Sequence, residues 1–495
     1  MARPTSPSPS ASCRTPSRRR CGRLPVGAPS EVETHPLLQG WFWLAVAALL
    51  IGWWAPFPFM TAMQQRALGV AAFALVSWSA QPIPIEISSL AVLLLLPASK
   101  LLDFSATFAP FSQPTIWLVF AGMVLSLLLS ATGLGDRLAL RVQPIITGGG
   151  RWRVLMGLHI LGLVTAFLVP SGVVRVLLLM PIGISLTQAI APSGGDDARR
   201  WGGAIALSLV CGTYFGGCGV LTGSVPNLVV TGQLEMATGR VVLWGEWLRW
   251  MFPVIGAARA ALCLVVVWLV AGRGLPEPAS QPETTDQRPL DRDQRRALFL
   301  LLTGVGLWAT DPIHGLPPVY VGLFLVLMAI LPGWGPLSLG RLREINFPLY
   351  FYIAALFGMG AALDLSGVNG RVIGSVLHLL PDAGGHWLSA CLALTAAAVP
   401  LDFLMDIAAV GAVVTPSLLE VGSQYGLTPI ASAMSVAMAT SLVFLPYQAA
   451  PFMVALSYRQ VPLRQMVGVM FLLSSLSLFL LCPLNVLYWR ITGLI

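Results

Sequence analysis

Residues 154–190 read VLMGLHILGLVTAFLVPSGVVRVLLLMPIGISLTQAI, an apolar run that is interrupted at Pro170-Ser171-Gly172. A helix needs about 20 apolar residues to cross a bilayer, so this run is too long for one span. Irregular backbone at membrane depth is tolerated only where it is buried in protein or lines a wet cavity. The interruption therefore predicts a broken transmembrane helix at a binding site.

The rest of the chain shares this apolar character. Of its 495 residues, 56% are hydrophobic and 10% are charged, and the mean hydropathy is +0.78. Soluble globular proteins carry about 25% charged residues. We therefore expect an all-α polytopic membrane protein embedded in a lipid bilayer. The composition excludes a soluble enzyme, a secreted domain and a nucleic-acid-binding protein, and the net charge of +8 owes much to six arginines within the first 40 residues.

The distribution of polar residues divides the chain into four regions. They are a disordered basic tail (1–36), a first transmembrane repeat (37–271), a polar linker (272–296) and a second transmembrane repeat (297–495). Arginines in the tail favour a cytoplasmic N-terminus. The chain has 29 basic residues, all but Lys100 arginine, a bias that suggests a bacterial protein and hence the cytoplasmic (inner) membrane.

The two halves resemble each other in three places, in the same order. Residues 114–133 align without gaps with 348–367, residues 170–181 with 405–416, and residues 223–227 with 448–452. We therefore predict two inverted repeats, each with a re-entrant hairpin and a broken transmembrane helix. The hairpins are expected at about 111–145 and 345–378, and the further helix breaks at 222–227, 400–406 and 446–451.

Four stretches resemble the divalent anion/sodium symporter family, whose members carry dicarboxylates, citrate or sulfate. They are AQPIPIEISSL (80–90), residues 114–140, residues 216–227 and residues 313–317. The resemblance covers the chain from about Trp41 to its end. It implies a secondary active transporter that couples a small anion to a sodium or proton gradient by an elevator-type movement. It also implies a homodimer, and no organic cofactor.

The chain departs from this family at the Ser-Asn-Thr signature that each half normally carries. The corresponding triplets read Ser171-Gly172-Val173 and Asp406-Ile407-Ala408, so the usual substrate and sodium stoichiometry do not carry over. The matching positions give the predicted site. The substrate-binding residues are Ser171, Gly172, Arg175, Ser224, Asn227, Asp406 and Gln448, and the ion-coupling residues are Ser171, Gly223, Asp402 and Asp406.

Arg175, Asp402 and Asp406 are charged residues within apolar surroundings. A charge at membrane depth costs about 2.5–3.5 kcal/mol even on lenient scales, so such residues face a cavity or pair with each other. Two interpretations follow. Arg175 and one aspartate form a structural ion pair, or Arg175 binds the anion while an aspartate couples to a cation or proton.

Two other functions compete with anion transport. A cation/proton antiporter of the same superfamily is the alternative, because aspartates replace the carboxylate-binding signature. A membrane-embedded transferase is the other, but the sequence has no HExxH or GxSxG motif and its five histidines are scattered. We therefore predict a protein that is not an enzyme and has no metal site beyond a possible sodium ion.

Overall fold

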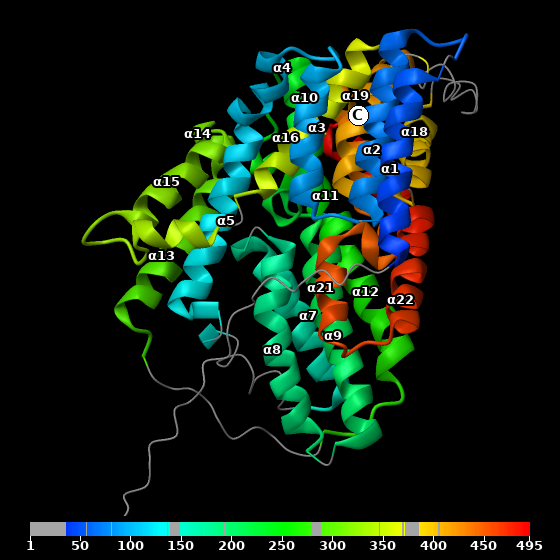
Figure 1. The fold of residues 1–495 in the computed structure, drawn as a ribbon. Coiled ribbons are helices and arrows are strands. Elements are labelled where there is room, and N and C mark those ends of the chain that lie inside the picture. Colours follow the sequence, from blue (N-terminus) through cyan, green and yellow to red (C-terminus); the bar gives the residue numbers. More distant parts are fainter. Residues whose placement is uncertain are drawn as a thin grey trace, which may run out of the picture.

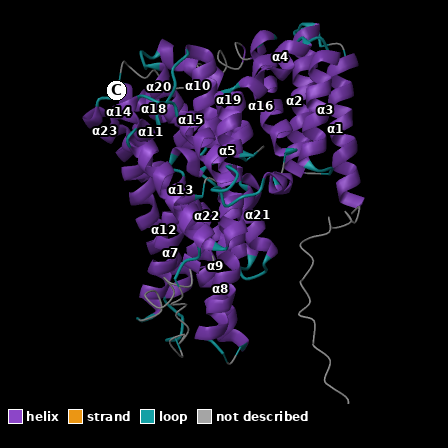
Figure 2. Ribbon diagram, turned by 90° about the vertical axis from the view of Figure 1, so that its left-hand side faces the viewer, coloured by secondary structure: helices purple, strands orange, loops and turns teal. Residues whose placement is uncertain are grey.

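The computed structural model describes residues 36–55, 57–80, 82–135, 137–138, 149–169, 171–192, 194–278, 289–345, 347–368, 371, 386–403 and 406–495. In this part of the chain the regular elements are helices, without a strand (Figures 1 and 2). The first half contains α1 (Pro36–Trp54), α2 (Ala62–Ala80), α3 (Ile85–Ala98), α4 (Phe104–Phe108), η1 (Ala109–Ser112), α5 (Pro114–Thr132), α7 (Arg151–Leu168), α8 (Gly172–Ile190), α9 (Gly195–Gly217), η2 (Leu221–Gly223), α10 (Val225–Thr238), α11 (Trp244–Met251), η3 (Phe252–Ala258), α12 (Arg259–Val267) and η4 (Trp268–Gly272).

The second half contains α13 (Arg292–Ala309), α14 (Asp311–His314), α15 (Pro318–Ile330), η5 (Leu339–Glu344), α16 (Leu349–Leu365), α18 (Trp387–Asp402), α19 (Ile407–Gln424), α20 (Pro429–Ala439), η6 (Pro446–Gln448), α21 (Ala450–Ser457), α22 (Leu463–Leu476), η7 (Ser477–Leu481) and α23 (Cys482–Thr492). The segments η3, η4 and η7 are π-helical, whereas the other η segments are 3₁₀ turns. The helix α13 starts inside the predicted linker, where Asp291 accepts a hydrogen bond from the Gln294 amide at 2.8 Å and caps it.

Six helical stretches in the described chain are long and apolar enough to cross a bilayer. They are Pro114–Thr132, Arg151–Leu168, Gly172–Ile190, Trp244–Gly272, Ile407–Gln424 and Leu463–Thr492, and six further apolar helices have 10–17 residues. This confirms the predicted all-α polytopic membrane protein. Residues 1–35 of the predicted tail lie outside the described residues.

The helices α7, α8 and α9 form a three-helix unit. Gly162 of α7 lies against Leu209 and Thr213 of α9, and Leu163 lies further along against Gly216, so α7 and α9 run parallel. Gly183 of α8 lies against Ile205 and Leu209, whereas Thr187, further along α8, lies against Gly202, so α8 is antiparallel to α9. The chain therefore reverses direction at Ser171. The break predicted there exists, but it separates two antiparallel helices instead of interrupting one straight helix.

The second half repeats this arrangement in α18, α19 and α20. The Thr395 hydroxyl donates to the Ser435 carbonyl at 3.0 Å, and the Gln448 side-chain amide, in η6 beyond the end of α20, donates to the Asp402 carbonyl at 2.6 Å. The later residue of the first segment, Asp402, contacts the later residue of the second segment, Gln448. The helices α18 and α20 therefore run parallel. The order of helix, break, two helices, 3₁₀ turn and helix thus occurs twice, as α7–α8–α9–η2–α10 and as α18–α19–α20–η6–α21.

These two units contact each other in a reciprocal way. The start of α8 packs against α21 near Gly172 and Pro451, and α10 packs against α19 near Pro226 and Gly411. Figures 1 and 2 both show α8 and α21 in the lower part of the molecule and α10 and α19 in the upper part. Since α8 corresponds to α19 and α10 to α21, each half presents the same two elements to the other half.

The helices α5 and α16 are the first arms of the two predicted hairpins. Both are followed by a glycine with left-handed backbone, Gly133 with φ 63° and Gly367 with φ 75°, at positions that the sequence alignment had paired. The second arms fall mostly in 139–148 and 369–385, outside the described residues, so the return of each hairpin stays a prediction. With 19 residues, α5 is itself long enough to cross the bilayer.

We predict that Gly162→Ala destabilises the protein. A Cβ at this position would lie 2.8 Å from the Leu209 carbonyl oxygen and 2.8 Å from the Thr213 backbone nitrogen, neither of which can move without shifting α9. Overpacking of this kind costs about 1–3 kcal/mol. The readout is the thermal unfolding temperature of the detergent-purified protein.

Gly306→Ala on α13 is the matched control, since a Cβ there has no neighbour within 4 Å and the position is exposed. It should leave the unfolding temperature unchanged or raise it, because alanine favours helix over glycine. Equal unfolding temperatures for the two variants would contradict the close packing of α7 on α9.

Candidate functional site

A cavity of about 540 Å³ lies where four helices begin. Its lining includes the first turns of all four: Ser171, Gly172, Val173 and Val174 of α8, Ser224, Val225 and Pro226 of α10, Asp406, Ile407 and Ala408 of α19, and Ala449, Ala450 and Pro451 of α21. The first N–H groups of a helix lack partners within the helix, and the helix start carries roughly +0.5 elementary charge. Two helices from each half therefore direct positive potential into one cavity.

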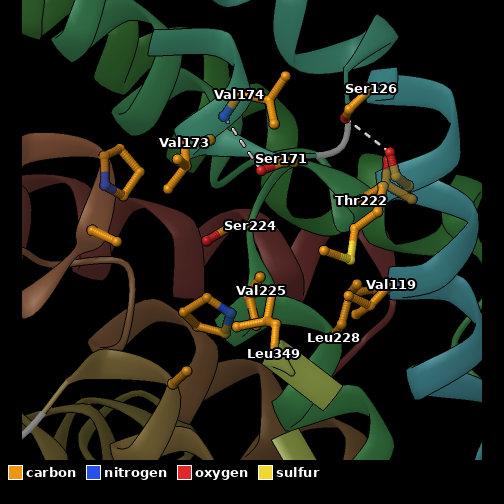
Figure 3. A pocket seen from close by; sticks show the side chains of 18 of the residues that line it. Val119, Ser126, Ser171, Val173, Val174, Thr222, Ser224, Val225, Leu228 and Leu349 are labelled. Carbon is orange, nitrogen blue, oxygen red and sulfur yellow. Dashed lines mark hydrogen bonds between the residues drawn. The ribbon is translucent and has the colours of Figure 1, made fainter. Parts of the chain in front are cut away.

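The four helix starts are capped differently. Ser171 accepts a hydrogen bond from the Val174 amide at 3.4 Å, which is a neutral cap on α8 (Figure 3). Asp406 accepts hydrogen bonds from the Ala408 amide at 2.8 Å and from the Tyr352 hydroxyl at 2.9 Å, which is a carboxylate cap on α19. The N-cap residues of α10 and α21 make no side-chain cap bond.

The remaining wall of the cavity is largely aliphatic. Leu118, Val119, Met123 and Leu127 of α5 and Leu349 of α16 contribute to it. In Figure 3, Val119, Leu228 and Leu349 lie toward the bottom of the view, well apart from Ser126 and Ser171. The hydroxyls of Ser126 and Ser130 also line the cavity, but they donate to carbonyls of their own helix, at 2.8 Å to Gly122 and 3.2 Å to Ser126. The α5 wall therefore offers a ligand little free hydrogen-bonding capacity.

The structure brings one group of the predicted site residues to the cavity and leaves another behind it. The residues that line the cavity are Ser171, Gly172, Gly223, Ser224 and Asp406. Arg175, Asn227, Asp402 and Gln448 are buried next to it but are not part of its lining.

Arg175 contacts backbone carbonyls in this structure and neither of the two aspartates that were considered as its ion-pair partners. Its guanidinium is fully buried and donates to the carbonyls of Val169 at 2.6 Å, Thr213 at 3.2 Å and Gly223 at 2.7 Å. Within the described chain it forms no ion pair with Asp402 or Asp406. Two guanidinium nitrogens donate to backbone oxygens at the end of α7, on α9 and on η2, whereas Nε has no hydrogen-bond partner among the described residues, and Arg175 is not part of the cavity lining.

Asn227 and Gln448 also act on the backbone rather than on the cavity. The Asn227 amide donates to the carbonyls of Cys218 at 3.1 Å and Val220 at 2.9 Å. The Gln448 oxygen accepts from the backbone amides of Phe444 and Leu445, both at 2.7 Å, and its nitrogen donates to Asp402. Both residues hold the irregular turns that place α10 and α21, and neither is part of the cavity lining.

Asp402 is the most unusual residue behind the cavity. Its side chain is fully buried at the end of α18, and neither carboxyl oxygen has a hydrogen-bond partner among the described residues. It lies close enough to Asp406 for their charges to interact. A buried carboxylate without a partner is among the most expensive groups in a protein interior, which singles out Asp402 among the residues behind the cavity.

Two tyrosines line the cavity that were not among the residues predicted from the sequence. Tyr352 of α16 lines the cavity and holds Asp406, and Tyr214 of α9 lines it with a buried hydroxyl. Both lie within apolar helices, where an aromatic residue is unremarkable. The signal that was available for Tyr214 is its place in the glycine-rich segment GTYFGG (212–217).

Comparison with known proteins shows to which family this chain belongs. The profile of the citrate transporter family (CitMHS) matches residues 72–441, which is most of the chain. The chain belongs to the citrate transporter family. This agrees with the resemblance to divalent anion/sodium symporters, which is confirmed.

Relatives of this citrate-transporter-family protein are distant but extend over much of its length. A membrane protein of Cupriavidus necator is 25% identical over 70% of this chain and 67% of the relative. The sodium-dependent dicarboxylate transporter SdcS of Staphylococcus saprophyticus is 22% identical over 81% of each chain. The L-tartrate/succinate antiporter of Escherichia coli K12 is 24% identical over 52% of this chain and 54% of the antiporter.

We predict that Arg175→Met lowers the thermal stability of the purified protein and does so whether or not a substrate is present. Three buried carbonyls lose their donor, and each unsatisfied group costs about 1–3 kcal/mol. Ser171→Ala, which removes a long cap bond, should cost about 1 kcal/mol or less. If Arg175→Met kept the wild-type unfolding temperature but lost transport, the arginine would be an anion ligand after all.

Proposed function

We propose that this protein is a secondary active transporter that moves a small organic anion across the bacterial cytoplasmic membrane. The observation that carries the proposal is the convergence of four helix starts, two from each half, on one cavity. Helix starts are ready-made anion sites, since their N–H groups and dipoles both favour negative charge. The cavity volume of about 540 Å³ lies within the range of roughly 300–1,000 Å³ that is usual for small-molecule sites.

The relatives support an anion of the carboxylate class. SdcS and a transporter of Caenorhabditis elegans are named as sodium-dependent dicarboxylate transporters, and the Escherichia coli relative as an L-tartrate/succinate antiporter. The family to which this chain belongs is itself named after citrate transport. No citrate, dicarboxylate or sulfate specificity is carried over residue by residue, because both signature triplets differ in this chain.

Asp402 is our candidate for the coupling group. Its buried carboxylate, without a partner among the described residues, is stable only with a cation or proton beside it, and that ion would travel with the substrate. The sodium-dependent relatives favour Na⁺. Asp406, the other predicted coupling residue, is already held by two hydrogen bonds.

The mechanism we propose is an elevator-type movement in a homodimer with two inverted repeats (37–271 and 297–495) and a cytoplasmic N-terminus. The reciprocal contacts α8 with α21 and α10 with α19 support the repeats, because a two-fold axis requires each contact to occur twice. The matched order of elements in the two units supports them as well. The units that surround the cavity would move together against the rest of the protein.

A cation/proton antiporter is the second candidate, and Asp402 is the specific observation that favours it. Such a protein would exchange ions at the aspartate without any organic anion. The two candidates separate in one assay, since the antiporter would move cations across the membrane with no anion in the buffer.

The test is uptake into proteoliposomes with a panel of labelled carboxylates, with and without a sodium or a proton gradient. We expect gradient-driven uptake of at least one carboxylate, and cation flux that requires it. Val173→Trp should abolish uptake by filling the cavity, while Leu94→Trp, on an exposed face of α3, should not. Cation flux without any anion would instead favour the antiporter.

We predict that Asp402→Asn separates exchange from accumulation. The amide can no longer hold a cation or proton as the carboxylate does, so uptake against a gradient should fall by about tenfold or more, a loss of roughly 1.4 kcal/mol in coupling. Exchange of labelled for unlabelled substrate should continue. A variant that still accumulates substrate would show that the coupling ion binds elsewhere.

A further inference from the structure

We propose that the substrate carries one negative charge on an apolar body, because the protein itself supplies the carboxylate that a second charged end of the substrate would provide. This inference rests on the proposed transport function and narrows its substrate class. Its structural basis is the difference in charge between the two halves of the site, together with the character of the α5 wall.

The four helix starts form two pairs, each with one helix from each half. In the pair of α8 and α21 the N-cap residues are Ser171 and Ala449, which are both neutral. In the pair of α10 and α19 the N-cap residues are Ser224 and Asp406. The two pairs are thus equivalent in their backbone but not in their charge, and a carboxylate is already built into one of them.

Asp406 occupies its helix start as an anionic ligand would. Its carboxylate accepts from the Ala408 amide at 2.8 Å and from the Tyr352 hydroxyl at 2.9 Å, and it lines the cavity. A second carboxylate of the substrate at this pair would meet a like charge. The pair of α8 and α21 is free of such a charge, so the single anionic end of the substrate belongs there.

The described lining offers no side chain that would offset a second negative charge. It contains neither Arg, Lys nor His, and its two acidic residues are Asp406 and Glu344. Glu344 is already paired with Arg341, through contacts of 2.8 Å and 3.0 Å. A second charged group of the substrate near the α10 and α19 starts would therefore add to the charge of Asp406, with no basic side chain in the described lining to offset it, which is costly in an apolar cavity.

The wall opposite Ser171 suits hydrocarbon. Leu118, Val119, Met123 and Leu349 face the cavity, and the α5 serine hydroxyls are bonded to their own helix. Apolar surface is stabilised against such a wall in proportion to its buried area. The ligand that fits is an organic monoanion, such as a monocarboxylate or monosulfonate, whose apolar chain points from the α8 start toward α5 and α16.

The experiment uses the purified full-length protein in sodium buffer. Straight-chain alkanesulfonates from two to six carbons are compared with α,ω-disulfonates of the same length, and butyrate with succinate. Sulfonates stay charged and do not leak through lipid as neutral acids. Binding is read as the shift of the unfolding temperature and as inhibition of carboxylate uptake. We expect affinity for the monoanions to rise roughly fourfold per methylene group and to exceed that for the matched dianions.

The charge itself is tested with Asp406→Asn, which keeps a good helix cap and removes the carboxylate. The ratio of dianion to monoanion affinity should rise by about tenfold or more, since a like charge has been removed from the cavity. Asp311→Asn is the matched control. This buried aspartate accepts from the Trp244 and Gly245 amides at the start of α11 and is not part of the cavity lining, so the ratio should not change.

The outcomes separate the inference from the function on which it rests. If wild-type protein prefers succinate and the disulfonates, and chain length has no effect, the substrate class is overturned while carboxylate transport stands. If Asp406→Asn fails to fold, the wild-type series still decides. If no carboxylate or sulfonate binds or is taken up, both the proposed function and the inference are wrong.

Discussion

Backbone carbonyls that leave a helix inside a membrane need donors from the protein, and this requirement is met here by three buried side chains. Arg175, Asn227 and Gln448 together donate to carbonyls of the α7 end, α9, the η2 turn and Asp402. Without them the turns after α7, α9 and α20 would carry unsatisfied groups, each costing several kcal/mol in hydrocarbon. Because these turns are fixed, the helices that follow them can begin at one common cavity.

These buried donors also determine which groups face the cavity. The carbonyls of the turns are hydrogen-bonded to Arg175, Asn227 and Gln448, which lie outside the cavity lining. The groups that face the cavity are therefore mainly helix starts, hydroxyls and aliphatic side chains. Negative charge is therefore favoured by the backbone rather than by arginine or lysine side chains in the described lining. Asp406, the N-cap of α19, adds a negative charge to the pair of α10 and α19, although the backbone of this pair matches that of α8 and α21.

The sequence predicted the fold class and the positions of the breaks, because proline and glycine within long apolar runs disfavour a continuous transmembrane helix. It also predicted that Ser171, Gly172, Gly223, Ser224 and Asp406 lie together, and these five residues line one cavity. It failed on the direction of the chain at Ser171, since a turn between antiparallel helices and a broken helix have the same local pattern. The tyrosines were missed because an apolar helix pattern does not reveal which aromatic residues reach a cavity.

Arg175 shows why the remaining site residues could not be assigned from sequence. A charge in an apolar stretch signals that something needs a donor, but it does not say whether that is a ligand or the backbone. The nearest carbonyl partner in sequence is six residues away, whereas the others are 38 and 48 residues away. The hydrophobic periodicity of a sequence describes one helix at a time, so it cannot predict contacts between residues 38 or 48 positions apart.

The long reach of these hydrogen bonds has a consequence for how the protein is made. Arg175 reaches the Gly223 carbonyl across 48 residues, and Gln448 reaches Asp402 across 46. Until the ribosome has delivered Gly223, the arginine of α8 lacks one of its acceptors, and until it has delivered Gln448, the carbonyl of Asp402 lacks this donor. These hydrogen bonds can therefore form only after the segments 175–223 and 402–448 have each been synthesised as a whole.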